Sequence, residues 1–258
     1  MLLSVVIPAR NEARNLDALI PQLAATLQAE AIPFEIVCVD DHSDDGTGDT
    51  VLAWSERIPG VRLVLNPRTN GFGMAIRAGI EAAVGDAVAI MMADSSDDPA
   101  DLVTYFRRIE QGYDCAFGSR FVSGGKVIDY PIHKLLLNRM ANTFIRFLFG
   151  MRFNDTTNAF KCYRREVIAG IQPLISKHFN LTVEMPLKAI IRGYSYQVVP
   201  ITWRNRKEGI SKLKIKEMGS RYLFIVLYLW LEKTLSRGDY RRPEPSRPMT
   251  VKASRTDA

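Results

Sequence analysis

The chain has 258 residues, of which 47% are hydrophobic and 24% are charged. This length suits one large domain or a domain with an appendage, and the apolar fraction excludes general disorder. No apolar stretch approaches the roughly 20 residues that a membrane-spanning helix needs. The cysteines Cys38, Cys115 and Cys162 lie far apart in apolar runs, and we recognise no signal peptide, so we expect a reducing, cytosolic compartment.

The net charge of +6 conceals an asymmetry between two parts of the chain. Residues 1–125 carry 9 basic and 18 acidic residues, a net charge of −9, whereas residues 126–235 carry 19 and 7, a net charge of +12. The acidic half argues against a nucleic-acid partner, because it would repel phosphates. The pattern instead favours carboxylates that hold a metal ion or sugar hydroxyls, followed by cations that meet phosphates or an anionic membrane surface.

The first 120 residues alternate apolar strands with helical stretches. We expect strands at 4–8, 34–40, 61–65 and 87–92, and helices at 15–30, 47–56 and 73–83. Strands that are apolar almost throughout and are separated by helices predict an α/β fold with a mainly parallel central sheet and helices on both faces. Ligands of such sheets gather where the strands end at their carboxyl edge.

Polar clusters follow three of these strands, at residues 8–12, 40–47 and 93–99. Because all three are placed at the same edge and contain acidic residues, they predict one shared site. Part of this chemistry has a plainer explanation, since Thr47 can cap the second helix and Asp98 can start the next one. Asp41 is then the better ligand candidate, and Asp97 is left open.

The later part of the chain changes character. Residues 132–149 place apolar side chains at helical spacing with basic and amide residues opposite, and residues 222–231 are apolar throughout behind a run of lysines. The first stretch alone would suit a helix packed on the domain core. Together in the basic half, the two stretches favour helices that dock on a membrane surface. From Ser236 onward the chain is rich in Arg, Pro and Ser, which predicts a disordered basic tail over 236–258.

Several of these segments, in this order, resemble family 2 glycosyltransferases of the dolichol-phosphate mannose synthase and polyprenyl-phosphate glycosyltransferase branch. The resemblance extends over about residues 3–215. It implies an A-type glycosyltransferase fold with a Rossmann-like nucleotide-binding half, followed by C-terminal amphipathic helices. We therefore expect a catalytic domain at 1–213, an interfacial docking helix at 214–235 and the tail at 236–258.

Two matching segments imply a nucleotide site. Pro8, Arg10 and Glu12 lie in the counterpart of the family's Pro-x-Tyr-Asn-Glu, with Arg10 in place of the tyrosine. Val39 and Asp41 lie in a segment that matches Val-Asp-Asp-x-Ser-x-Asp-Gly-Thr. In relatives these segments hold the base and ribose of the nucleotide, and carboxylates suit hydroxyl and N–H donors. The sequence Asn70-Gly71-Phe72-Gly73 resembles the glycine-rich entry to the family's next helix, which is weak evidence alone.

The metal motif departs from the family. Where relatives have Asp-Ala-Asp, this chain has Met92-Ala93-Asp94, and Ser96 replaces a glutamine. Methionine is a poor ligand for a hard cation, but Mg²⁺ needs only one or two carboxylates beside substrate phosphates and water. The resemblance therefore implies Mg²⁺ or Mn²⁺ at Asp94, and Asp97 in the following turn is an open candidate for a second oxygen donor.

Further segments imply contacts to the substrates. Arg120, in Gly-Ser-Arg-Phe, is expected to contact the donor sugar or the acceptor phosphate. Arg206, Ser211 and Lys212 match Arg-x-x-Gly-x-Ser-Lys, a loop that closes over the donor diphosphate in relatives. The family's Asp-x-Thr-Ser-Gly-Phe-Arg segment is changed here at Asn158, Ala159 and Lys161, so a difference in acceptor or sugar preference is compatible with this sequence. Glu184 stands where relatives also have Glu, with a surface ion pair as the alternative.

The resemblance implies inverting transfer from a GDP- or UDP-linked sugar to a polyprenyl phosphate at the cytosolic membrane face. The catalytic residues would be Asp94, Arg120, Arg206 and Lys212. A phosphate acceptor needs no strong base, whereas a hydroxyl acceptor would need one, Asp97 or Glu184. Three alternative functions are sugar transfer to a hydroxyl acceptor, a sugar-phosphate nucleotidyltransferase and a catalytically silent scaffold. A membrane-protein partner or a homo-oligomer is left open.

Overall fold

The computed structural model describes residues 1–205 and 215–242. Three predicted site residues, Arg206, Ser211 and Lys212, therefore lie outside the described residues. The helices are α1 (Ala13–Ala29), α2 (Thr47–Ser55), α3 (Phe72–Ala82), α4 (Pro99–Glu110), α5 (Ile132–Phe149), α6 (Arg165–Gly170), α7 (Leu181–Ile191) and α8 (Ile215–Leu235). The strands are β1 (Leu3–Ala9), β2 (Phe34–Asp40), β3 (Val61–Leu65), β4 (Ala87–Ile90), β5 (Cys115–Ser119), β6 (Lys126–Ile128), β7 (Lys161–Arg164), β8 (Tyr196–Pro200) and β9 (Thr202–Arg204).

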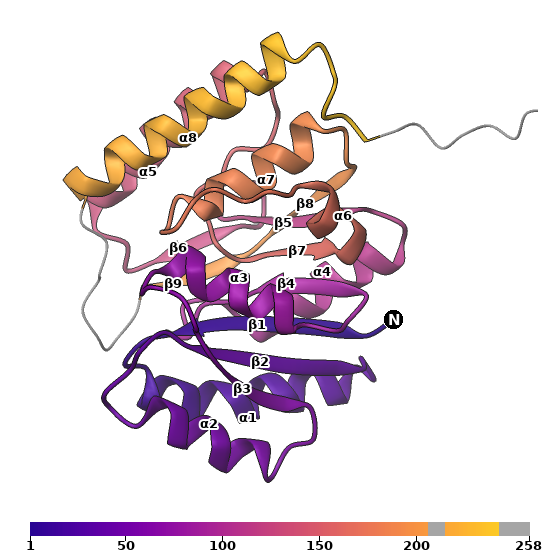
Figure 1. Cartoon of the computed structure of the whole chain (residues 1–258), viewed down its shortest axis with the longest axis vertical. Coiled ribbons are helices and arrows are strands. Elements are labelled where there is room, and N and C mark those ends of the chain that lie inside the picture. Colours follow the sequence, from indigo (N-terminus) through magenta and orange to yellow (C-terminus); the bar gives the residue numbers. More distant parts are fainter. Residues whose placement is uncertain (206–214, 243–258) are drawn as a thin grey trace, which may run out of the picture.

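Seven strands form one sheet in the order β3-β2-β1-β4-β7-β5-β8 (Figure 1). Strand β7 runs antiparallel to both of its neighbours, and the other pairs are parallel. The predicted mainly parallel sheet is confirmed. Strand β4 ends at Ile90, two residues earlier than expected, because Met91 and Met92 already lead into the turn before α4. Strands β6 and β9 pair separately beside the main sheet.

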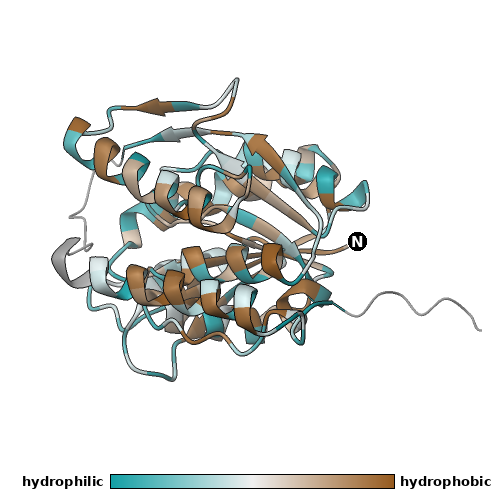
Figure 2. Cartoon of the chain, turned by 90° about the horizontal axis from the view of Figure 1, so that it is seen from above, coloured by the Kyte–Doolittle hydropathy of each residue, from teal (hydrophilic) through white to brown (hydrophobic). Residues whose placement is uncertain are grey.

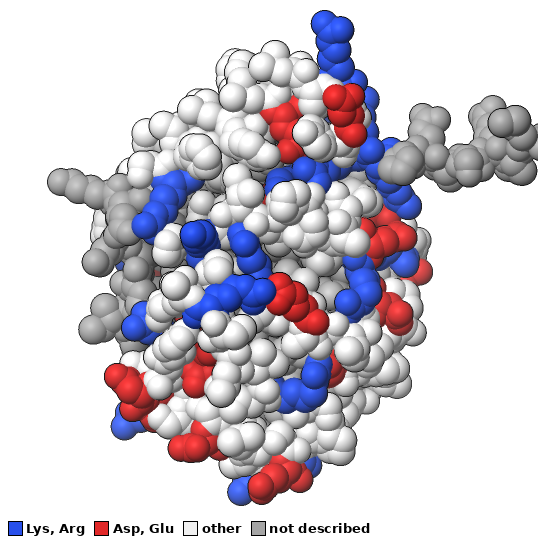
Figure 3. Space-filling model, in the orientation of Figure 1, with Lys and Arg blue, Asp and Glu red and all other residues white. Residues whose placement is uncertain are grey.

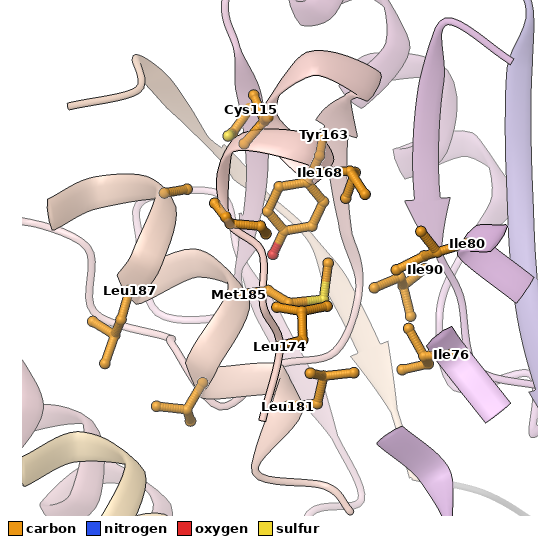
Figure 4. Close-up of a cluster of buried hydrophobic side chains, with 14 of the residues drawn as sticks. Ile76, Ile80, Ile90, Cys115, Tyr163, Ile168, Leu174, Leu181, Met185 and Leu187 are labelled. Carbon is orange, nitrogen blue, oxygen red and sulfur yellow. The ribbon is translucent and has the colours of Figure 1, made fainter. Parts of the chain in front are cut away.

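Alternate side chains of the strands face two hydrophobic clusters. Val5 and Ile7 of β1 point to the cluster formed with α1, α2 and α4, whereas Val6 points to the cluster formed with α3, α7 and α8. Figure 4 shows the second cluster, with Ile76 and Ile80 of α3 lying opposite Leu181, Met185 and Leu187 of α7. Burying apolar side chains on both faces is the main stabilising contribution to such a sheet.

The expected boundary of a disordered tail at Ser236 is too early. The backbone N–H of Arg242 donates to the Arg192 carbonyl at 2.8 Å, and its guanidinium bonds the carboxylate of Asp114 at 3.1 Å. Arg242 also lies 5.3 Å from the ring centre of Tyr194. These contacts hold residues 236–242 against the domain, and residues 243–258 lie outside the described residues.

Candidate active site

The loops after β1 and β2 are joined by reciprocal hydrogen bonds. The side chain of Asn11 donates to Asp44 at 2.7 Å and accepts from the Asp44 backbone N–H at 3.0 Å. The Glu12 N–H donates to Thr47 Oγ1, and the Ala13 N–H donates to Asp45. The first two acidic segments therefore form one edge, as expected. Gly46, rather than Thr47, is the N-cap residue of α2, because the helix begins at Thr47, whose hydroxyl instead accepts from the Glu12 N–H.

The predicted nucleotide residues of these loops lie together at this edge. Pro8 and Val39 are buried partners in adjacent strands, so they contribute backbone and wall rather than charge. Arg10 is exposed just beyond β1, and Glu12 is half-buried and accepts from Asn15 at 2.5 Å. Their contacts to a nucleotide stay a prediction, and their positions are compatible with it.

Asp41 organises the neighbouring loop. Its buried carboxylate accepts from the Asn66 side chain at 2.7 Å and from the Gly71 N–H at 2.9 Å. Gly71 then packs so closely that an added Cβ would lie 2.7 Å from the Lys177 carbonyl oxygen. The weak Gly-x-Gly signal thus has a steric cause, whereas Asn66 carried no recognisable signal in the sequence. A carboxylate offers about four lone-pair directions, so Asp41 retains acceptor capacity toward a ligand.

Two buried carboxylates lie in the turn after β4. Asp94 accepts from the Ser96 N–H at 3.1 Å, and Asp97 accepts from the Met92 N–H at 3.2 Å. Asp97 thus reaches back to the position where relatives carry their first aspartate. Burial, and then the nearby Asp94 carboxylate, raise the pKa of Asp97 to about 7. Asp98 instead caps α4 by accepting from the Ala100 N–H, the plainer role considered for it.

This carboxylate pair fits a divalent cation. Two acidic side chains that disfavour each other's charge in a buried turn would be stabilised by a positive ion between them. Mg²⁺ in proteins commonly uses one or two carboxylates and completes its shell with substrate phosphates and water. The described residues contain no cluster of three or more His, Cys, Asp or Glu side chains that could hold a metal without such a substrate.

Strand β9 lies beside the same turn. Asp97 pairs with Trp203 as an isolated bridge, and the Arg204 N–H donates to the Ser96 carbonyl at 3.1 Å. The first described range ends at Asn205, whose N–H donates to the Ile128 carbonyl of β6. The described residues Trp203 and Arg204 therefore lie beside the carboxylates, and the rest of that motif lies outside the described residues.

Arg120 is engaged within the protein. Its guanidinium makes a bidentate pair with the buried Asp155, at 2.6 and 2.8 Å. Burial would lower its pKa, but Asp155 outweighs this effect and the pKa is raised. The guanidinium also lies within 6 Å of the rings of Tyr130 and Trp203, at 5.7 and 5.6 Å. These contacts position the β6–β9 corner next to Asp97, and the predicted substrate contact of Arg120 stays a prediction.

Two buried ionic groups were not anticipated. Glu184 does not form a surface ion pair, because it is fully buried with Lys188 at 2.8 Å and accepts two backbone N–H groups of the preceding loop. Lys161 is also buried, donates to the carbonyls of Thr156 and Thr182, and has its pKa lowered to about 7 by burial. A single sequence offers no signal for such burial, since both lie in segments with ordinary charge spacing.

Helix α5 presents its apolar side outward. Asn138 and Asn142 donate to Thr157 Oγ1 at 2.8 and 2.9 Å, and Arg139 donates to the Asn154 carbonyl. Most apolar residues on the opposite side are exposed, together with several of α8. Figure 2 colours both helices by hydropathy. The exposed set is Ile132, Leu136, Leu137, Met140, Phe144, Phe147, Leu223, Phe224, Leu227, Tyr228, Leu231 and Leu235. We call these twelve residues the apolar face.

The charges near the apolar face are mainly basic. Helix α5 carries Lys134, Arg139 and Arg146 and no acidic residue. Figure 3 shows basic side chains gathered across the middle and upper part of one side of the molecule. Within the described residues, neither α5 nor α8 nor any other helix combines the length and the apolarity needed to cross a bilayer.

Solved structures share this fold. A glucosyl-3-phosphoglycerate synthase from Mycobacterium tuberculosis, in complex with phosphoglyceric acid, has a TM-score of 0.67 and covers 90% of this chain and 79% of its own at 17% identity. A further mycobacterial protein has a TM-score of 0.70 over 88% and 74% of the two chains at 16% identity. At such identity the likeness concerns the fold alone, which is that of the A-type glycosyltransferases, as expected.

The chain belongs to glycosyl transferase family 2, whose family model matches residues 4–171. It is 35% identical to the polyprenol monophosphomannose synthase of Mycolicibacterium smegmatis over 218 residues, which cover 81% of this chain and 80% of the relative. It is 33% identical to a dolichol-phosphate mannosyltransferase of Pyrococcus furiosus over 84% of this chain, and spans about 60% of that relative's length. The resemblance is confirmed, and the protein is a glycosyltransferase.

Proposed function

We propose that the protein transfers a sugar from a nucleoside-diphosphate sugar, GDP- or UDP-linked, to a polyprenyl phosphate, with inversion at the anomeric carbon. Its two curated relatives are named for mannose transfer to polyprenol and dolichol phosphate. The observation that carries the proposal is the place of the apolar face. The ring centres of Tyr130 and Trp203 lie 4.8 Å apart, and Trp203 pairs with Asp97. Helix α5 begins two residues after Tyr130. A lipid-linked acceptor could therefore approach the carboxylates along α5.

The acidic edge suits the nucleotide sugar. Asp41 and the loops of Arg10 and Glu12 would receive the base and ribose, and Asp94 with Asp97 would hold Mg²⁺ or Mn²⁺ against the diphosphate. Structures of the glucosyl-3-phosphoglycerate synthase from Mycobacterium tuberculosis contain UDP together with Mn²⁺ or Mg²⁺. When bound, the ion would neutralise the charge that develops on the leaving diphosphate. Arg206, Ser211 and Lys212 would contribute further donors to the same oxygens.

With a phosphate acceptor, the site would need no strong base. The second pKa of a phosphate monoester is about 6, so the acceptor is largely a dianion at neutral pH. One of its oxygens attacks the anomeric carbon, and the bond to the diphosphate oxygen breaks with its electron pair on the leaving group. The protein then contributes mainly orientation and charge stabilisation.

A hydroxyl acceptor is the second candidate, and Asp97 favours it. In that scheme Asp94 alone would hold the metal ion, and Asp97, whose pKa is raised to about 7, would take the proton of the hydroxyl. Glu184 is a weaker candidate for the base than Asp97, because it is buried in the ion pair with Lys188. The two proposals separate in one assay, since transfer to polyprenyl phosphate with none to free polyprenol supports the first, and the reverse supports the second.

We further propose that the protein works at the cytosolic face of an anionic membrane, bound peripherally through the apolar face. A few basic residues near such a surface each contribute about 1 kcal/mol to binding. A second copy or a membrane protein could cover the same face, and nucleic acid is not expected to bind. Residues 1–213 would be the catalytic domain, 214–235 the docking helix, and the tail would follow the ordered segment 236–242.

The Asp94→Ala variant tests the metal role. We expect transfer to fall at least about 100-fold, because charge stabilisation by a bound ion is worth several kcal/mol in the transition state. The thermal melting temperature should change little. Asp98→Asn is the matched control, since it alters a carboxylate of the same turn but retains a good capping residue. Near-normal transfer by Asp94→Ala at an unchanged melting temperature would remove the role.

A second variant pair tests the basic segment. Arg206→Ala and Lys212→Ala should each weaken binding of the nucleoside diphosphate by about 1–3 kcal/mol, the range for hydrogen bonds to charged groups. Isothermal calorimetry with GDP and UDP in the presence of Mg²⁺ measures this change. Affinities equal to that of the unmodified protein would contradict the assignment.

A further inference from the structure

The loop that precedes α7 packs directly on the start of α3. The Gly73 N–H donates to the Lys177 carbonyl at 3.1 Å, and an added Cβ on Gly73 would lie 2.7 Å from the Ser176 carbonyl oxygen. The rings of Phe72 and Phe179 stack with centres 4.2 Å apart and an angle of 15° between their planes. No side chain fits between the two backbones, so the position of residues 71–73 depends on this loop.

The same loop is held from beneath by buried charge. The Glu184 carboxylate accepts the N–H groups of Ile175 and Ser176 at 2.8 and 2.7 Å. Lys188 pairs with Glu184 and donates to the Pro173 carbonyl. Arg77 of α3 donates to the Ser176 carbonyl at 2.9 Å, which ties the loop to α3 a second time.

Helix α8 holds the loop from the side of the apolar face. The Tyr222 hydroxyl donates to the Phe179 carbonyl at 3.1 Å, an oxygen that also accepts from the hydroxyl and N–H of Thr182. Beyond Phe72, the Gly71 N–H donates to Asp41. Contacts therefore run without interruption from Tyr222 through Phe179 and Phe72 to the carboxylate at the nucleotide edge.

We propose that residues 175–180 are a positioning element for nucleotide binding, with Phe179 as its central residue, and that Tyr222 and Glu184 hold it in place. This inference rests on the proposed function only in naming a nucleotide as the ligand. Phe179 touches no substrate in this scheme. It fixes Gly71 and thereby the orientation of Asp41. If the loop is correctly placed for only a fraction of the time, the apparent affinity for the nucleotide is lowered by that fraction.

The main test compares Phe179→Leu with Phe34→Leu. Phe34 is also half-buried, but it packs in the cluster on the other face of the sheet. Hydrogen exchange measured by mass spectrometry on peptides that contain Gly71 and Gly73 should quicken roughly two- to tenfold in Phe179→Leu, the fold-change that loss of an aromatic pair corresponds to. It should stay unchanged in Phe34→Leu, and Phe179→Tyr, which keeps the ring, should restore slow exchange.

Calorimetry with GDP and UDP in the presence of Mg²⁺ supplies the second readout. The dissociation constant should rise two- to tenfold in Phe179→Leu. It should rise by less in Tyr222→Phe, which removes only one hydroxyl. This milder variant tests the proposal if Phe179→Leu does not fold. Unchanged exchange at Gly71 and Gly73, or faster exchange with unchanged affinity, would overturn the proposal. If the unmodified protein binds neither nucleotide, the proposed function fails. The hydrogen-exchange rates at Gly71 and Gly73 then decide by themselves whether the loop positions Gly71.

Discussion

Helices α1 and α5 have the same kind of amphipathic pattern, but most large apolar residues of α5 face outward. Six apolar residues of α1 are buried against the sheet, among them Leu19 and Leu23. Six large apolar residues of α5 are exposed, among them Met140 and Phe147, at 68% and 87%. The difference lies in what each helix meets. Helix α1 meets an apolar sheet, whereas the inward side of α5 combines buried Ile145 and Phe149 with hydrogen bonds to Thr157 and Asn154.

The comparison shows that helical periodicity predicts a two-sided helix but not which side faces the protein. An exposed apolar surface of this extent is typical of an interaction site. The following predictions test the contrast between the two helices, beginning with the largest expected effect.

Truncating an apolar residue should have opposite consequences in the two helices. Leu23→Ala in α1 should lower the free energy of unfolding by about 2–5 kcal/mol, because it leaves a cavity in the core. Met140→Ala in α5 should change it by less than about 0.5 kcal/mol, as for exposed positions elsewhere. Urea denaturation of both variants measures the difference. Equal losses would mean that the outward side of α5 is buried in solution.

Adding charge to the apolar face should weaken membrane binding. The double variant Met140→Glu with Phe147→Glu should reduce co-sedimentation with phosphatidylglycerol vesicles at least tenfold, since each large apolar side chain contributes about 1.5–3 kcal/mol when buried. Thr143→Glu adds one such charge at an exposed polar position of α5 and serves as the control for each single variant, Met140→Glu and Phe147→Glu. High salt should weaken binding without abolishing it, and truncation before Lys214 should release the protein.

A protein that stays in the supernatant at low salt would contradict peripheral binding. The hydroxyl-acceptor proposal would then rank ahead of the lipid-phosphate proposal.

The side of the sheet under α5 and α7 also contains a buried cation, which predicts a pH dependence. Burial lowers the pKa of Lys161 to about 7, so above pH 7 the folded state binds fewer protons there than the unfolded state does. Stability should therefore rise with pH. Between pH 7 and 8.5 the unfolding free energy should increase by about 1.5 kcal/mol relative to that of Lys161→Met. Parallel pH profiles for the two proteins would show that Lys161 is charged in the fold.

The smallest expected effect concerns the inward side of α5. Asn142→Ala removes hydrogen bonds to Thr157 and should lower the unfolding free energy by about 1 kcal/mol. Thr143→Ala, one residue along on the exposed side, should have no measurable effect. If the two variants have equal stability, the polar side of α5 does not hold the helix on the domain.

Much of the architecture could be predicted from the sequence because its strands are apolar and its turns are polar. The β1, β2 and β4 edges follow from this alternation, and so does their meeting at one place. Strand β7 was not predicted, because Lys161–Arg164 contains two basic residues and reads as a surface segment. It enters the sheet through pairing with β4 and β5, which depends on tertiary contacts rather than on local pattern.

The candidate site was predicted in part. The loops of Arg10, Asp41 and Asp94 carry local motifs, and the structure places them at one edge. Asn66 and Phe179 act through partners more than 20 residues away in the sequence, such as Asp41 and Phe72, so spacing gives no indication of them. The bidentate pairing of Arg120 with Asp155, 35 residues further on, is a long-range contact of the same kind.

The insertion of β7 between β4 and β5 has a consequence for the order of assembly. Strands β3, β2, β1 and β4 are contiguous in the sheet and lie within residues 3–90, so this half can pair as soon as it has been synthesised. Strand β5, by contrast, cannot join the sheet until Lys161–Arg164 has emerged to bridge it to β4. Such long-range closure slows folding. During synthesis, strands β1 to β4 would therefore pair first, and strand β5 would join the sheet only after β7 has been made.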